Sequence, residues 1–328
     1  AIDRRSGTCR WRHDLSRVRE PAWLAAGGGE VFCLVRGRDR FLLSAFSADT
    51  GRLLGEASID VQDDRPIALW PVDAGRCVVA FSGGVDSAVV AAAAARRLGR
   101  EQVRVVMAIG PAVAEGERQT AERVARAIGL DLQIGEAGEI DDPAYVRNDV
   151  RRCFYCKTNL YRALAETPEA RAGWPIVNGT NADDLGDYRP GLEAASQHDV
   201  VSPLVEAGIG KDQVRELARL WQLEVHDKPA TPCLASRIVY GISVTPERLS
   251  KIDAAERFLK GLGFATVRVR LHGDDLARIE LDPEDLTKLL DYPLRSGVVD
   301  ELVRLGFRYI TLDLFGFRSG SLNPGFKP

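Results

Sequence analysis

From about residue 76 the chain alternates between short apolar runs and longer amphipathic segments. "RCVVAF" (76–81) and "QVRVVMAIG" (102–110) are mostly apolar, whereas "ERQTAERVARAIG" (117–129) has the spacing of an amphipathic helix. Such apolar runs are typical of strands buried on both faces, and helices between them indicate a parallel sheet. We therefore predict an α/β fold with a doubly wound parallel sheet over residues 76–242. Further strands are expected at 130–137 and 174–180, and helices at 87–98, 142–166 and 211–223.

After about residue 243 the chain repeats a smaller unit. "RFLKGLGFATVRVRL" and "ELVRLGFRYITLDL" each run from a helix through Leu-Gly-Phe into a strand, and "LARIEL" adds a strand between them. This order predicts a small α+β domain over residues 243–328. We expect this domain to bind substrate and to form an interface between copies of the chain.

Residues 1–70 have a different, β-rich pattern. "EVFCLV" and "RFLLSAF" predict two strands joined by the polar turn "RGRDR". "AIDRRSGTCRW" and "AFSADTGRLLG" align with Gly7 over Gly51, and this pattern resembles the repeats of quinoprotein-type propellers. One period is too little for a closed propeller. We expect a β-rich appendage or a piece of a larger propeller, and a chance likeness is the alternative.

Composition narrows the class of protein. The chain of 328 residues carries a formal net charge of −3, which does not favour a nucleic-acid partner. No apolar run reaches the roughly 18 residues of a membrane span, and the Arg-rich first residues do not resemble a signal peptide. Its six cysteines are too few for a disulfide scaffold in a chain this long. We expect a cytoplasmic protein that acts on a small molecule.

A glycine-rich loop follows the first strand of the predicted sheet. It reads Ser82-Gly83-Gly84-Val85-Asp86-Ser87, at the carboxyl end of a strand where α/β proteins bind ligands. Glycines let the backbone curve round a phosphate, and the helix that follows directs free N–H groups at it. The loop is neither a Walker A sequence nor a dinucleotide fingerprint. It resembles the PP-loop of ATP pyrophosphatases, with Asp86 suited to Mg²⁺. A tight turn with an N-capping serine is the alternative.

The stretch "NGTNADDLGDYRPG" (178–191) also follows a predicted strand. Asn178, Thr180 and Asn181 are candidates to hold the nucleotide, and Asp183 is a candidate to help bind Mg²⁺. The alternative is that these side chains form turns and helix caps.

Several motifs in a fixed order narrow the resemblance. "RCFYCKTNLY", "NGTNADDLGDYRPG", "SPLVEAGIGKDQVREL", "DKPATPCLASRIVYG", "RVRLHGDDLARIE" and "FRSGSLN" together resemble the LarE family of ATP-dependent sulfur transferases over about residues 76–325. The resemblance implies adenylylation of a carboxylate of pyridinium-3,5-biscarboxylic acid mononucleotide. Sulfur insertion then gives a thiocarboxylate on the way to the nickel-pincer nucleotide of lactate racemase.

The resemblance also implies roles for the cysteines. Cys233 stands where the family places its sulfur donor, which single-cysteine members sacrifice as dehydroalanine. Cys153 and Cys156, spaced to share a helix face, resemble the ligands of cluster-bearing members. With Cys233 they would hold a [4Fe–4S] cluster with one open iron. A sacrificial Cys233, a structural zinc and inert thiols are the alternatives. We expect the other cysteines, Cys9, Cys33 and Cys77, to be ordinary thiols.

Charged residues form the candidate substrate site. In "TVRVRLH" the arginines alternate with apolar residues, which predicts that both lie on one strand face. Two guanidiniums on one face would suit a phosphate, and a solvated strand face is the alternative. Glu256 lies beside an apolar helix stripe and needs a partner, for which we expect Arg268 or Arg270, while Arg278 would pair with Glu280. The resemblance assigns Glu256, Arg268, Arg270 and Glu280 to the phosphate site of the substrate, and Lys211 matches a family position for the nucleotide. Lys157, next to Cys156, is a candidate to meet a phosphate, and Ser236 and Arg237, in the loop of Cys233, are further candidates to bind substrate. Solvated helix lysines are the alternative for Lys157 and Lys211.

Two other functions fit parts of this pattern. An ATP pyrophosphatase that forms an amide or thiolates tRNA would use the same loop, but no glutaminase-like half is visible. A non-catalytic nucleotide-binding scaffold is the second alternative, which the intact order of motifs disfavours.

Overall fold

The computed structural model describes residues 22–27, 30–36, 40–47, 52–60, 75–186, 190–229, 231–318 and 321–322. The repeat positions Gly7 and Gly51, and Cys9, lie outside these ranges. In the described part of the chain, no helix combines the length and apolar character needed to cross a bilayer.

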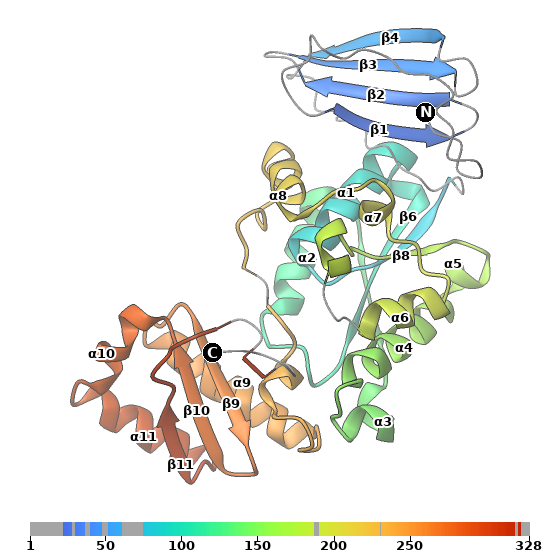
Figure 1. Cartoon of the computed structure of the whole chain (residues 1–328). Helices are drawn as coiled ribbons and strands as arrows, with labels where there is room; N and C mark the ends of the chain where they lie inside the picture. The colour runs from blue at the N-terminus through green and yellow to red at the C-terminus, as the bar shows by residue number, and fades with distance from the viewer. Residues whose placement is uncertain are drawn as a thin grey trace.

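The first body is a four-stranded antiparallel sheet in the simple order β1-β2-β3-β4 (Figure 1). Its strands are β1 (Ala22–Gly27), β2 (Glu30–Arg36), β3 (Arg40–Ser47) and β4 (Leu53–Asp60). The two runs expected to be strands are β2 and β3, which pair with Cys33 opposite Ser44. Antiparallel neighbours need only short connections between them. Membership of a propeller stays a prediction.

The central sheet is parallel and has the order β7-β6-β5-β8. Strand β5 lies next to β6 on one side and β8 on the other, so the chain reverses its winding direction between β5 and β8. This confirms the doubly wound α/β fold, and ligands of such sheets bind where the winding reverses. The strands are β5 (Cys77–Ala80), β6 (Val103–Ile109), β7 (Leu132–Glu136) and β8 (Ile176–Val177).

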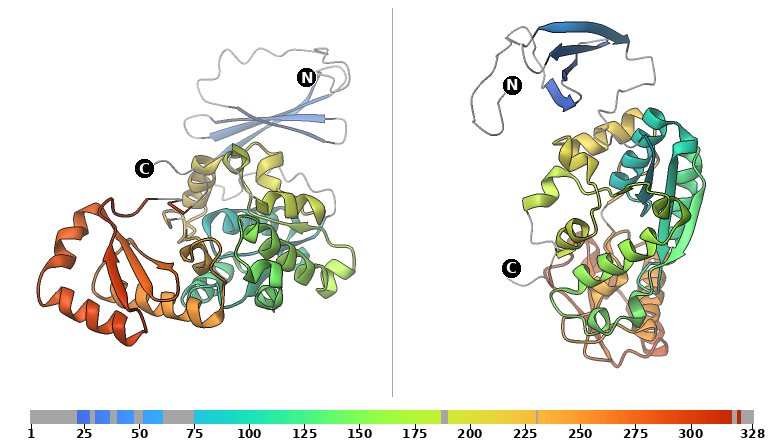
Figure 2. Two further views of the ribbon diagram at one scale, coloured as in Figure 1. Left: turned by 60° about the horizontal axis from the view of Figure 1, so that its bottom comes forward. Right: turned by 90° about the vertical axis from the view of Figure 1, so that its right-hand side faces the viewer.

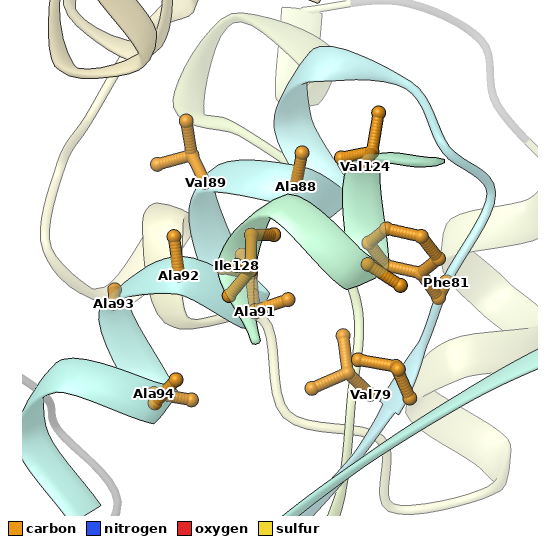
Figure 3. Close-up of a cluster of buried hydrophobic side chains, with 14 of the residues drawn as sticks. Val79, Phe81, Ala88, Val89, Ala91, Ala92, Ala93, Ala94, Val124 and Ile128 are labelled. Carbon is orange, nitrogen blue, oxygen red and sulfur yellow. The ribbon is translucent and has the colours of Figure 1, made fainter. Parts of the chain in front are cut away.

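Helices cover both faces of this sheet. Val79 of β5 packs with α1 (Val85–Leu98), α2 (Glu117–Ile128) and α8 (Lys211–Leu220), as Figure 3 shows for α1 and α2. Val78, one residue earlier, packs on the other face with α4 (Arg152–Ala165) and α6 (Pro190–Gln197). Successive strand residues point to opposite faces, and here both faces are buried, which explains the continuous apolar runs. Short helices α5 (Pro168–Arg171) and α7 (Pro203–Glu206) complete this domain.

The C-terminal domain is a three-stranded sheet in the order β11-β10-β9 with helices against it (Figure 2). Its apolar core continues into the central domain, since Ala112, Tyr145 and Leu234 belong to the same buried cluster as Leu249 and Phe264. The two domains therefore share a core. The elements of the C-terminal domain are α9 (Pro246–Gly261), β9 (Val267–His272), β10 (Leu276–Leu281), α10 (Leu286–Leu290), α11 (Leu294–Arg304) and β11 (Tyr309–Leu312).

The strand expected at 174–180 is only the two residues Ile176–Val177, and an expected helix is broken. The segment 142–166 is not a single helix, but breaks into α3 (Pro143–Val146) and α4. Asn148 causes the break with a left-handed backbone (φ 56°), which asparagine adopts more readily than most residues. Its buried side-chain amide donates to the carbonyls of Ile238, Val239 and Ile242 at 3.4, 3.0 and 2.7 Å. The tertiary contacts of this side chain outweigh the local helical pattern.

We expect Asn148→Ala to lower the free energy of unfolding by about 3 kcal/mol, because it leaves several buried polar groups without partners. Urea denaturation would measure this loss. Gln222→Ala is the matched control, because Gln222 has the same left-handed backbone (φ 55°) but an exposed side chain. Its cost should stay below about 1 kcal/mol. Equal losses in the two variants would show that backbone conformation alone matters at Asn148.

Candidate functional site

The loop at residues 82–87 is closed by its two serines. The hydroxyls of Ser82 and Ser87 lie 3.1 Å apart, and Ser87 Oγ donates to the Gly84 carbonyl at 3.1 Å. Gly83 has a left-handed backbone (φ 69°), and a Cβ there would lie 2.8 Å from Ala121 Cα of α2. Only glycine fits this close approach. Gly84 caps α1 without a side-chain hydrogen bond, so the first N–H groups of this long helix are available to an anion.

The second polar loop lies directly against the first. A Cβ on Gly179 would come within 2.6 Å of the Ser87 backbone nitrogen. Asn181 Nδ2 donates to Asp86 Oδ1 at 3.0 Å, and Lys211 Nζ donates to Asp86 Oδ2 at 2.6 Å. The structure therefore brings together residues from the ends of β5 and β8 and from the start of α8, as expected for a site where the winding reverses.

Other candidates in this loop have structural partners. Asn178 accepts bonds from Thr180 N and Ser202 Oγ, both at 3.0 Å, and donates to the Tyr161 hydroxyl at 3.2 Å. Asp183 Oδ2 accepts the Lys211 backbone N–H at 2.7 Å, at the first turn of α8. Asp183 thus acts as a helix cap, the alternative foreseen for this stretch. Asp86 is the better candidate for Mg²⁺: each of its oxygens accepts one bond and keeps a lone pair for a hard cation.

The loop that carries Cys233 is tied to the same sheet at the carboxyl end of its strands. Leu234 N donates to the Ala112 carbonyl at 2.8 Å, and Ala112 follows β6, the neighbour of β5. The thiol of Cys233 is exposed. Arg152 of α4 donates to the Ala235 carbonyl at 2.8 Å and so ties the loop to the helix that bears Cys153 and Cys156.

The three cysteines of the motifs lie near enough for their charges to interact. Burial raises the pKa of Cys156 to about 12, and the charges of Cys233 and Cys153 contribute to this shift. Lys157 also interacts with all three thiols. Nevertheless, no group of three His, Cys, Asp or Glu side chains in the described ranges is arranged to hold a metal ion. The arrangement therefore gives no support to the expected [4Fe–4S] cluster. Cys77 lies in the core, and burial raises its pKa to about 12.

Sequence reasoning missed a set of buried polar residues, some of whose charges interact with the cysteines. It consists of Tyr145, whose hydroxyl has no partner in the described residues, together with Asn148 and Arg152. Burial raises the pKa of Tyr145, and the nearby charges of Cys233 and Cys156 raise it further. Glu139 is also buried, and a Cβ on Gly110 would lie 2.1 Å from its Oε1. The only signal in the sequence was polar residues inside a segment that resembled one long helix.

Strand β9 places its arginines as predicted. Arg268 and Arg270 lie on one face, while Val267, Val269 and Leu271 are buried in the core. Arg270 pairs with Glu280 at 2.8 Å, and Arg278 also pairs with Glu280 at 3.0 Å, as expected.

The partner of Glu256 is different from the one we predicted. Glu256 binds Arg237, not Arg268 or Arg270. Arg237 follows Cys233 in the short turn of residues 234–237, which packs against α9 and so faces Glu256 directly. The guanidinium of Arg268 instead bonds its own neighbour's carbonyl and stacks on Phe317 at 5.3 Å. Desolvation and the charge of Arg237 lower the pKa of Arg268.

Comparison with known proteins agrees with this geometry. A family model for NAD synthase matches residues 70–148, which include the loop at 82–87. The pyridinium-3,5-bisthiocarboxylic acid mononucleotide synthase of Lactiplantibacillus plantarum is 38% identical over 251 residues, or 76% of this chain and 90% of that protein. The chain belongs to the LarE family. An uncharacterised protein of Synechocystis is 40% identical over 76% of this chain and 92% of its own length.

A more distant relative of this chain matches a shorter part of it. It is one of the subunits of the glutamine-hydrolysing GMP synthase of Methanopyrus kandleri, 29% identical over 56% of this chain and 62% of its own length. Membership of the LarE family, together with the PP-loop that matches the NAD synthase model, supports an enzyme that uses ATP.

Proposed function

We propose that this protein is an ATP-dependent sulfur transferase that acts on pyridinium-3,5-biscarboxylic acid mononucleotide. The observation that carries the proposal is its 38% identity to the L. plantarum synthase over 90% of that protein. The GMP synthase relatives, which would favour amide formation, match over a shorter part of the chain. The product would be a thiocarboxylate for nickel-pincer cofactor synthesis.

The first step would activate the substrate. A carboxylate is a poor acyl donor because its oxygen leaves badly, and joining it to AMP supplies a good leaving group. The loop at residues 82–87 and the N-terminus of α1 would hold the departing pyrophosphate. Asp86 would hold Mg²⁺, which neutralises charge on the phosphates of ATP. Lys211, already bonded to Asp86 at 2.6 Å, lies where a cation can meet the same phosphates.

The second step would transfer sulfur from Cys233. Its thiolate would attack the acyl carbon and expel AMP, leaving a thioester between substrate and protein. Loss of the Cys233 Cα proton and cleavage of the Cβ–S bond would release the thiocarboxylate and leave dehydroalanine. This is the sacrificial route of the family, and it requires no metal at the cysteines.

Incubation of the protein with ATP, Mg²⁺ and the pyridinium substrate should release pyrophosphate and AMP in step with a thiocarboxylate product. Mass spectrometry of the small molecules and of the protein would follow both halves of the reaction. The sacrificial route predicts one sulfur transferred per chain and a matching loss of mass at Cys233.

Iron and acid-labile sulfide in anaerobically purified protein, together with several turnovers, would instead support the cluster-bearing route. An amide product with ammonia as the only nucleophile would favour the synthetase alternative. If no ATP is consumed with the pyridinium substrate, the proposed function is wrong.

A further inference from the structure

Arg237 and Glu256 form a buried ion pair beside Cys233. Their side chains are 1% and 3% exposed, and they meet through two parallel bonds, Nε to Oε1 at 2.9 Å and Nη2 to Oε2 at 3.1 Å. A buried ion pair of this kind often stabilises a protein no better than apolar side chains of the same size. Its presence next to the reactive cysteine therefore needs a reason other than stability.

The remaining nitrogen of Arg237 holds the backbone on either side of the Cys233 Cα. Its Nη1 donates to the carbonyl oxygens of Pro232 at 2.5 Å and Cys233 at 3.1 Å, and to Ser236 Oγ at 3.0 Å. The side chains of residues 231–233 are exposed, so apolar packing does little to fix this part of the loop. One guanidinium thus sets the position of both peptide units that flank the Cα of Cys233.

Glu256 anchors this guanidinium to the C-terminal domain. Its Oε1 also accepts the backbone N–H of Val269 at 3.1 Å, so the carboxylate is fixed by α9 and by β9. A second arginine acts in the same way, because Arg270 donates to the Ser236 carbonyl at 3.1 Å while paired with Glu280. The carbonyls of the loop are therefore held by arginines that are each held by a buried glutamate.

The same bonds leave Arg237 with little capacity to bind a substrate. All three of its nitrogens donate to protein acceptors. Arg268 differs, because its charge faces no carboxylate at bonding distance among the residues described here, and it remains partly exposed. Among these residues, an anionic substrate group would find a guanidinium without a carboxylate partner at Arg268 and not at Arg237.

We infer that Arg237 and Glu256 are positioning residues for Cys233: the ion pair fixes the peptide units around the cysteine so that its sulfur meets the adenylated carboxylate. This inference rests on the proposed function. It separates two roles, since the pair should matter to sulfur transfer and not to substrate binding or adenylylation. A displacement of about 1 Å in a reacting atom can slow a reaction about a hundredfold.

The test compares the two half-reactions in Arg237→Lys and Glu256→Gln. Lysine keeps the charge but loses the fork, whereas glutamine keeps the shape of Glu256 but loses its charge. Pyrophosphate exchange would measure adenylylation and the KM for the pyridinium substrate, and quenched-flow mass spectrometry would measure single-turnover sulfur transfer. We expect adenylylation and KM to stay within about threefold and sulfur transfer to slow at least about a hundredfold.

The matched control is Arg104→Lys. Arg104 also forms a partly buried ion pair, with Glu169 at 3.0 Å, but it lies at the amino end of β6, away from the site. This variant should retain both half-reactions. Thermal unfolding of each variant would show whether it is folded. If Arg237→Lys does not fold, the half-reactions can still be compared in Glu256→Gln, which is the smaller change.

Two results would overturn the inference while the wild-type protein remains active. One is a large rise in KM with equal losses in both half-reactions, which would make Arg237 a substrate ligand. The other is unchanged sulfur transfer in folded variants. A wild-type protein that neither adenylylates nor thiolates the substrate would overturn the proposed function instead.

Discussion

Cys233→Ser should abolish thiocarboxylate formation while pyrophosphate exchange continues. Serine cannot supply sulfur, and its hydroxyl is a far weaker nucleophile, so product should fall by at least about a thousandfold. Under the proposed function, adenylylation would depend on the loop at residues 82–87, which is held closed by the hydroxyls of Ser82 and Ser87 and not by the Cys233 thiol. The expected result is an adenylated substrate that accumulates, detected by mass spectrometry after acid quench.

Thr231→Ala is the control for this variant. Thr231 is exposed in the same loop, and its hydroxyl donates to the nearby Pro229 carbonyl at 3.3 Å. It should retain sulfur transfer. Thiocarboxylate formed at the wild-type rate by Cys233→Ser would show that the sulfur comes from elsewhere, with Cys153 and Cys156 as the first positions to substitute.

Gly179→Ala should impair the use of ATP. The added Cβ would lie 2.6 Å from the Ser87 nitrogen, so the end of β8 and the start of α1 must move apart. Overpacking of this kind costs about 1–3 kcal/mol of stability. The shift should also lower kcat/KM for ATP by about a hundredfold, because it misplaces the loop that would hold the phosphates. Steady-state pyrophosphate release against ATP concentration would measure this loss.

Gly186→Ala is the control, because it adds a methyl group to the same polar segment (178–191) and tests whether any added methyl group there lowers stability and kcat/KM. A Cβ on Gly186 would meet nothing within 4 Å, so both stability and kcat/KM should stay near the wild-type values. Equal losses in the two variants would mean that the close approach of Gly179 to Ser87 is not what matters. Normal ATP kinetics in Gly179→Ala would contradict the proposed position of the phosphates.

Much of the fold could be predicted because its signals are local. The apolar run at 76–81 became β5, which is buried on both faces, and the glycines after it became the turn into α1. The alternation in "TVRVRLH" placed Arg268 and Arg270 on one face, because the side-chain period of a strand depends only on sequence spacing. The motif order likewise pointed to the family before any geometry was known.

Partners within the site could not be predicted in the same way. We expected Glu256 to pair with Arg268 or Arg270, but its actual partner is Arg237. Asn148 looked like one residue of a long helix, yet it binds carbonyls about ninety positions further along the chain. Such pairings depend on which elements pack together, and local patterns do not contain that information.

The sequence by itself determined the strands, the phosphate loop and the residue types available for sulfur chemistry, because these follow from local spacing and side-chain chemistry. The tertiary structure alone decided that Lys211 meets Asp86 and that Arg237 is occupied by Glu256. It also decided that the charges of the three cysteines interact, while no metal-binding group forms among the residues described. These outcomes depend on distances between segments far apart in the chain. Packing of α1 with α8 in the central core brings Lys211 to Asp86, and the core shared by the two domains brings Arg237 to Glu256.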